Sequence, residues 1–152
     1  MALRQVVVKA LPKVHVLSLR KTIDSYRAQG PLWGQVMAFA HEQHFDITAP
    51  NFSMYHDMGY KEKDVDVELC VPVRDDVSVP PPFKIYELEG VPKTASIVHN
   101  GPYETLPQTY NELYAWIAHN KETPCGPGRE VYVKMEPADP SANVTEIYVP
   151  IA

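Results

Sequence analysis

The sequence repeats a short motif near its middle and again at its end. The first copy is VDVELCVPV (65–73) and the second is VTEIYVPI (144–151). A second strand-like segment precedes each copy at a similar distance, NFSMYHD (51–57) in the first half and REVYVKM (129–135) in the second. Each half of the chain is therefore expected to end in a pair of strands, and this duplication restricts the possible folds more than any other feature.

A helical pattern lies upstream of each strand pair. The segments are PLWGQVMAFAHEQ (31–43) and ETLPQTYNELYAWIAHN (104–120), and in both the apolar residues recur three and four positions apart. Pro31 and Pro107 suit a first helical turn, where the missing N–H costs nothing. The pattern predicts helices near residues 31–43 and 105–119.

Each half also opens with a strand-like segment after a Pro-Lys pair, PKVHVLSLR in the first half and PKTASIVHN in the second. The order strand, helix, strand, strand thus occurs twice, in repeats of about residues 1–76 and 82–152. Between them lies VSVPPPFKIYELEG, whose three consecutive prolines favour an extended connector because proline cannot donate to a strand ladder. We predict one α+β domain, residues 1–152, whose repeats pack about a pseudo-twofold axis with a cleft between them.

The composition is that of a globular protein, with 45% hydrophobic and 22% charged residues. No apolar run approaches the roughly 18 residues of a membrane span, and the N-terminus alternates like a strand rather than a signal peptide. A cytoplasmic location without membrane contact is expected.

The net charge of −5 and the lack of a Lys/Arg cluster argue against nucleic-acid binding. Cys70 and Cys125 form no Cys-x-x-Cys pair and are predicted to be free thiols.

The segment REVYVKM carries a carboxylate among strand-forming residues. Alternation sends Glu130 and Tyr132 to one face of the strand and Val131 and Val133 to the other. If the valines pack on apolar neighbours, the acid and the ring share the opposite face. From the pattern alone a solvent-facing Glu130 is favoured, because glutamate is rarely fully buried.

The second half resembles the GyrI-like small-molecule-binding domain, which also forms the effector-binding half of AraC-type and MerR-type multidrug regulators. The residues that carry the resemblance are the His-x-Gly-Pro-Tyr turn from His99 to Tyr103, the Glu-x-Tyr strand at Glu130 and the closing segment from Thr145 to Ile151. The first half fits as a degenerate repeat. Since the sequence begins directly at the first strand, without the helix-turn-helix of such regulators, we expect a stand-alone domain.

The resemblance implies a curved antiparallel sheet with a ligand pocket where the halves meet, and an acid on the REVYVKM strand within that pocket. It thereby reverses the solvent-facing interpretation of Glu130. In an apolar site, a bound organic cation stabilises the charged form of a carboxylate, and aromatic walls attract the cation through cation–π interactions. Trp33 and Tyr110 correspond in the two helices, and Met37 would give an adaptable wall, although all three also suit a plain core. The predicted ligand-binding residues are Trp33, Met37, Tyr55, Tyr103, Tyr110, Tyr114, Glu130 and Tyr132.

Three functions follow from the resemblance. The first is binding of lipophilic, aromatic, often cationic small molecules by a monomer or weak dimer. The second is hydrolysis of strained cyclopropane-bearing electrophiles, with Glu130 activating water and Tyr132 or Tyr103 assisting. The third is modulation of a partner protein such as DNA gyrase. No cofactor is expected.

Five polar residues outside this set are expected to serve the fold. His41 and His44 are three positions apart rather than the four of the zinc-protease motif, so no metal site is expected. His99 is expected to hold its turn through a backbone hydrogen bond. Glu68 and Glu146 occupy equivalent repeat positions, which favours a structural duty, with a subsidiary pocket role left open.

Overall fold

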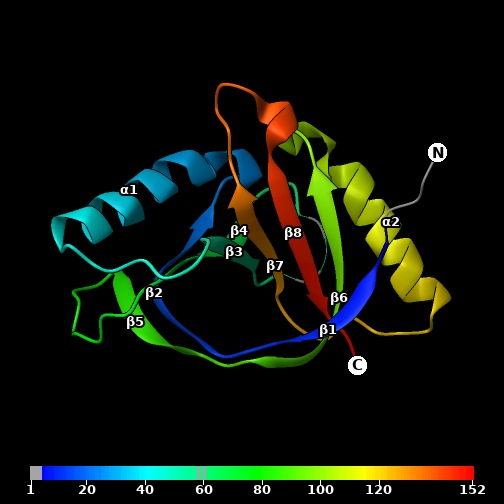
Figure 1. Cartoon of the computed structure of the whole chain (residues 1–152), viewed down its shortest axis with the longest axis horizontal. Helices are drawn as coiled ribbons and strands as arrows, with labels where there is room; N and C mark the ends of the chain where they lie inside the picture. Colours follow the sequence, from blue (N-terminus) through cyan, green and yellow to red (C-terminus); the bar gives the residue numbers. More distant parts are fainter. Residues whose placement is uncertain (1–4, 58, 60) are drawn as a thin grey trace. The chain divides into compact units, whose positions relative to one another are not determined.

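The computed structural model describes residues 5–57, 59 and 61–152 (Figure 1). The chain divides into two compact units. Unit 2 is Lys13–Gly90, and unit 1 combines the described part of Met1–Pro12 with Val91–Ala152. Each unit consists of one α-helix and four antiparallel strands, which confirms the predicted α+β class.

Unit 2 orders its strands β5-β2-β4-β3, and every neighbouring pair is antiparallel. In chain order its elements are β2 (Val14–Ile23), the 3-10 turn η1 (Tyr26–Ala28), α1 (Gln29–Glu42), β3 (Phe52–Tyr55), β4 (Val65–Pro72) and β5 (Phe83–Leu88). Alternate residues of β2 and β4 face the helix, so Leu17, Leu19 and Leu69 form a core with Leu32 and Val36 of α1.

Unit 1 orders its strands β1-β6-β8-β7, again with antiparallel neighbours, and α2 runs alongside β6 (Figure 1). In chain order its elements are β1 (Val7–Leu11), β6 (Val91–Asn100), the 3-10 turn η2 (Tyr103–Thr105), α2 (Leu106–His119), β7 (Gly128–Lys134), the 3-10 turn η3 (Pro140–Ala142) and β8 (Val144–Pro150). Its core joins Ile97 and Ile147 of the sheet to Leu113 and Ile117 of α2.

The repeat predicted from the sequence is present in the structure. Both helices lie within two residues of their predicted bounds, and NFSMYHD and REVYVKM form β3 and β7, each paired with the strand that closes its half. The connector VSVPPPFKIYELEG differs from the expectation, because FKIYEL forms strand β5 and pairs with β2. An extended connector was predicted from the prolines, yet Phe83 and the residues after it alternate and retain their N–H donors.

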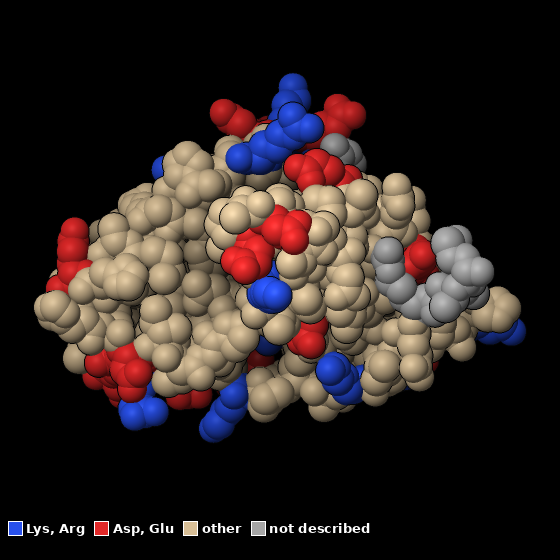
Figure 2. Space-filling view, turned by 45° about the horizontal axis from the view of Figure 1, so that its top comes forward, with Lys and Arg blue, Asp and Glu red and all other residues tan. Residues whose placement is uncertain are grey.

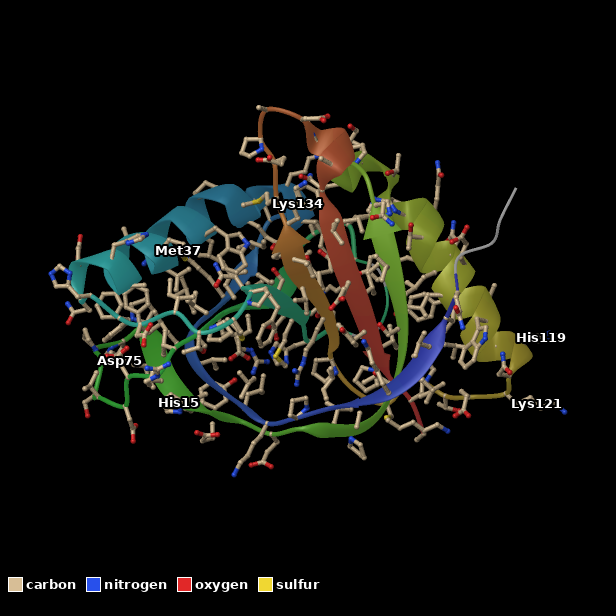
Figure 3. All side chains as sticks on the ribbon, viewed as in Figure 1. His15, Met37, Asp75, His119, Lys121 and Lys134 are labelled. Atoms are coloured by element: carbon tan, nitrogen blue, oxygen red, sulfur yellow. The ribbon has the colours of Figure 1, made fainter. Side chains whose placement is uncertain are left out.

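The two helices end in the same way. His44 after α1 and Lys121 after α2 adopt left-handed conformations, with φ of 55° and 57°. In each case the following N–H bonds back across the last turn, from Phe45 to the Ala40 carbonyl at 3.1 Å and from Glu122 to the Ile117 carbonyl at 3.0 Å. These are Schellman caps. Figure 3 shows Lys121 just beyond His119, the last residue of α2.

The described surface carries charges of both signs. Figure 2 shows acidic and basic side chains interspersed over the face drawn. Within the described ranges, no helix is long and apolar enough to cross a membrane, and no cluster of three metal-ligating side chains occurs. Cys70 is buried and Cys125 is exposed, and both are thiols outside any disulfide, as predicted.

Candidate functional site

Glu130 lies on the helix-covered face of unit 1. It pairs across the sheet with Ile147, which in turn pairs with Ile97, and both isoleucines belong to the core under α2. The residue is only 7% exposed, whereas Val133 is 45% exposed. The assumption that Val131 and Val133 would form the packed face of this strand is therefore wrong. The acid occupies the buried face because β7 turns that face toward the core.

Two tyrosine hydroxyls donate to the Glu130 carboxylate. The Tyr110 hydroxyl, from α2, lies 2.5 Å from Oε2, and the Tyr132 hydroxyl, from the same strand as the acid, lies 3.1 Å from Oε1. Hydrogen bonds to an ionised acceptor are about twice as strong as neutral ones. A buried acid is thus tied at both oxygens, to the helix and to its own strand.

Aromatic rings lead from the acid toward the surface of unit 1. The Tyr103 ring meets the Tyr132 ring edge-on, with centroids 6.0 Å apart, and the Tyr114 ring lies nearly parallel to Tyr110 at 6.4 Å. Burial and the charge of Glu130 both raise the pKa of Tyr103 above its ordinary value of 10.0. Tyr103 and Tyr114 are partly exposed, so a ligand could reach the rings around the acid.

The other predicted ligand-binding residues belong to unit 2. Trp33 and Met37 lie on α1 and pack partly buried against the unit 2 core, and Figure 3 marks the position of Met37. The Met37 sulfur accepts a hydrogen bond from the Asn51 amide at 3.5 Å. Tyr55 ends β3 and packs against the same core. The structure thus collects five predicted residues in unit 1 and three in unit 2.

The sequence interpretation missed three residues around Tyr55. The Tyr26 ring meets Tyr55 edge-on at 5.4 Å, the Ser53 hydroxyl donates to Gln29 Oε1 at 3.0 Å, and the Gln29 amide donates to the Tyr55 hydroxyl at 2.8 Å. A constant offset between the repeats matches positions 26, 53 and 55 to 103, 130 and 132. Unit 2 therefore contains a neutral counterpart of the acid cluster, and extending the repeat alignment to residue 26 would have found it.

His99 holds the turn before α2, as predicted. It is buried, and its Nε2 lies 2.9 Å from the carbonyl of Pro102, so this nitrogen must carry the proton. Its Nδ1 lies 2.6 Å from the Thr109 hydroxyl and forms a hydrogen bond with it. Gly101, within the turn, has a φ of 126°, a conformation that a residue with a side chain rarely adopts. The histidine thus ties the turn to the helix.

Glu68 and Glu146 each accept a hydrogen bond from a tyrosine of their own unit, as a structural duty requires. Tyr86 donates to Glu68, and Tyr148 donates to Glu146 at 2.6 Å. His56 Nε2 also lies 2.9 Å from Glu68. Burial raises the pKa of Glu68, but hydrogen bonds from His56, Tyr86 and Ser18 outweigh it and hold the pKa below its ordinary value of 4.5.

The sequence matches the GyrI-like small molecule binding domain over residues 4–152. The chain belongs to the GyrI-like family. No curated protein matches it closely enough to add a further assignment.

Solved structures share the fold of this GyrI-like domain. The EcmrR C-terminal domain is 26% identical, with a TM-score of 0.91 and 99% of each chain covered. Against EcmrR in its DNA complex, also 26% identical, the TM-score is 0.89 and 97% of the present chain is covered, but the match spans only 57% of the EcmrR chain.

Two more distant structures carry ligand or activity descriptions of their own. SAV2435 bound to tetraphenylphosphonium is 13% identical, with a TM-score of 0.66 and coverage of 97% and 94% of the two chains. A hydrolase from Listeria innocua is 12% identical, with a TM-score of 0.66 and coverage of 98% and 92%. At these identities the likeness concerns the fold alone.

Proposed function

We propose that this GyrI-like domain binds lipophilic aromatic cations, with Glu130 as the counter-charge. The observation that carries the proposal is a carboxylate only 7% exposed, bonded by the hydroxyls of Tyr110 and Tyr132. Removing a charge from water is costly unless an opposite charge compensates it, so a cationic ligand placed beside this buried acid would stabilise its charged form.

The rings around the acid supply the rest of the affinity. A cation over an aromatic face gains about 0.5–2 kcal/mol. Tyr110 and Tyr132 contact the acid, and the rings of Tyr114 and Tyr103 lie next to them. Because both Glu130 oxygens already accept hydroxyl protons, recognition would depend on charge and stacking more than on hydrogen-bond donors of the ligand. Tetraphenylphosphonium, the ligand of the distant relative SAV2435, has this chemistry and is a suitable probe.

The decisive comparison is between tetraphenylphosphonium and neutral triphenylphosphine oxide, titrated into the wild type and Glu130→Gln by calorimetry. The substitution keeps the shape and removes the charge, so affinity for the cation should fall by about 1–3 kcal/mol, or about 5-fold to 150-fold. Binding of the neutral compound should change much less. Glu146→Gln, which removes another tyrosine-bonded acid of unit 1, is the matched control. Equal loss for both compounds would contradict the counter-charge role.

Hydrolysis is the second candidate, favoured by the 3.1 Å contact between the Tyr132 hydroxyl and Glu130 Oε1, which places a proton donor beside a base. In a cyclopropane-bearing electrophile, the oxygen of water would bond to a ring carbon while Glu130 accepts the water proton. The electron pair of the breaking C–C bond would take a proton from the Tyr132 hydroxyl, which Glu130 would then restore. Mass analysis after incubation with such a compound separates the candidates. A hydrolase consumes it, and Glu130→Gln should lower turnover about a hundredfold or more.

A further inference from the structure

A small polar hollow lies in unit 2, on the sheet face away from α1. Side chains alternate along β2, so Leu17 and Leu19 point into the helix-covered core while Ser18 and Arg20 point to the opposite face. The hollow has a volume of about 210 Å³ and is lined by Ser18, Arg20, Glu68, Pro82, Lys84 and Tyr86. Ligand sites for drug-sized molecules are usually about 300–1,000 Å³, so this one suits a smaller molecule.

The floor of the hollow is negative and rich in hydrogen-bond acceptors. Glu68 and Ser18 are 4% and 3% exposed. Ser18, Tyr86 and His56 donate to the carboxylate and fix its position. A hydroxyl that donates its proton keeps acceptor lone pairs, so the Ser18 and Tyr86 oxygens can still receive a donor from a ligand.

The rim of the hollow is positive. Arg20 is held by Asp66 through two parallel hydrogen bonds of 3.0 and 2.8 Å, which use two of its five N–H donors. The Lys84 ammonium lies 4.7 Å from the centroid of the Tyr86 ring. Within the described part of the chain, no carboxylate forms an ion pair with Lys84. The rim thus carries the Lys84 ammonium and an arginine already paired with Asp66, both above the buried carboxylate of Glu68.

The other repeat shows that the fold does not need the arginine of this rim. In the strand register Arg20 pairs with Glu68, and the corresponding partner of Glu146 is Val98. In unit 1 the acid Glu146 is also bonded to a tyrosine, Tyr148, but no arginine lies opposite it. An acid bonded to a tyrosine is thus present in both units, and so is a lysine near that tyrosine ring, since the Lys9 ammonium lies 5.3 Å from the centroid of the Tyr148 ring. The arginine is the part of the rim that is specific to unit 2.

We propose that this hollow binds a small zwitterion of the amino-acid type, with its carboxylate at Arg20 and Lys84 and its ammonium at Glu68. A simple anion that entered deeply would meet the charge of Glu68, and a simple cation would have to pass the two rim cations. A molecule that carries both charges on adjacent carbons satisfies floor and rim together. This site is independent of the Glu130 cluster and of the function proposed for it.

The test is a titration of the full chain with glycine, acetate and methylammonium, followed by amide chemical shifts in NMR spectra. Glycine should shift the signals of Ser18, Lys84 and Tyr86, and each single-charge probe should bind about tenfold more weakly or worse. Lys84→Met should weaken glycine binding about tenfold, whereas Lys21→Met, an exposed lysine of β2, should leave it unchanged.

Three results would overturn the proposal: no shifts with glycine, acetate binding as well as glycine, or equal effects of the two lysine substitutions. Glu68→Gln gives a second check on the floor, because it should abolish the preference for glycine over acetate. If that variant does not fold, the two lysine variants still decide the matter, since both remove exposed side chains.

Discussion

Replacing Tyr110 by Phe isolates the hydrogen bond that ties Glu130 to α2. The ring and its packing remain, and the loss is one O–H donor at 2.5 Å from a carboxylate that is 7% exposed. A hydrogen bond to a charged group is worth about 1.5–3 kcal/mol, and burial limits its replacement by water. We expect the free energy of unfolding to fall by about 1.5–3 kcal/mol in urea denaturation followed by circular dichroism.

A double-mutant cycle makes the test specific. In a Glu130→Gln background the acceptor is neutral, so the same Tyr110→Phe substitution should cost only about 0.5–1.5 kcal/mol. Tyr103→Phe is the matched control, because this ring belongs to the same cluster and, among the described hydrogen bonds, its hydroxyl donates to no carboxylate. If Tyr110→Phe costs no more than Tyr103→Phe, the reasoning about the buried acid is refuted.

Two further predictions concern stability. Because the folded-state pKa of Glu68 lies below its ordinary value of 4.5, its charge stabilises the fold above that value and the benefit is lost as the pH falls through the lower folded pKa. The unfolding free-energy gap between the wild type and Glu68→Gln, measured in urea, should therefore shrink as the pH falls below 4.5, and a constant gap would contradict an ionised Glu68. His44→Gly and Lys121→Gly should each raise the free energy of unfolding by about 0.5–1 kcal/mol, because glycine adopts the left-handed cap without strain. Thermal melts should show no such gain for His44→Ala, and a gain as large with alanine would exclude the cap explanation.

The helices and paired strands could be predicted because their signals are local or repeated. Apolar spacing located α1 and α2 within two residues, and the echo between residues 65–73 and 144–151 revealed the duplication. Strand β5 was missed as a ladder strand because the prolines before Phe83 suggested a connector. Its pairing with β2 depends on residues far away in the sequence, which no local pattern reports.

The site was harder to predict than the fold, because strand alternation defines two faces but does not indicate which of them is buried. Glu130 and Val133 could each have faced the core, and only the packing of α2 against β6 and β8 decides between them. Hydrogen bonding between Tyr110 and Glu130 joins a helix to a strand 20 residues away, a relation that spacing alone does not encode. By contrast, the role of His99 was predictable because its partner Pro102 lies within the same turn.

The pairing of strands β1 and β5 determines whether the two halves of the sequence can exist as separate fragments. The first strand of each half pairs with the second strand of the other half, β1 with β6 and β5 with β2. A fragment that ends at the prolines keeps β1 without its partner and leaves β2 without β5. Exposed strand edges of this kind invite pairing with other chains. The duplicated sequence is therefore not a pair of separable halves, since each half depends on the other to complete its row of backbone hydrogen bonds.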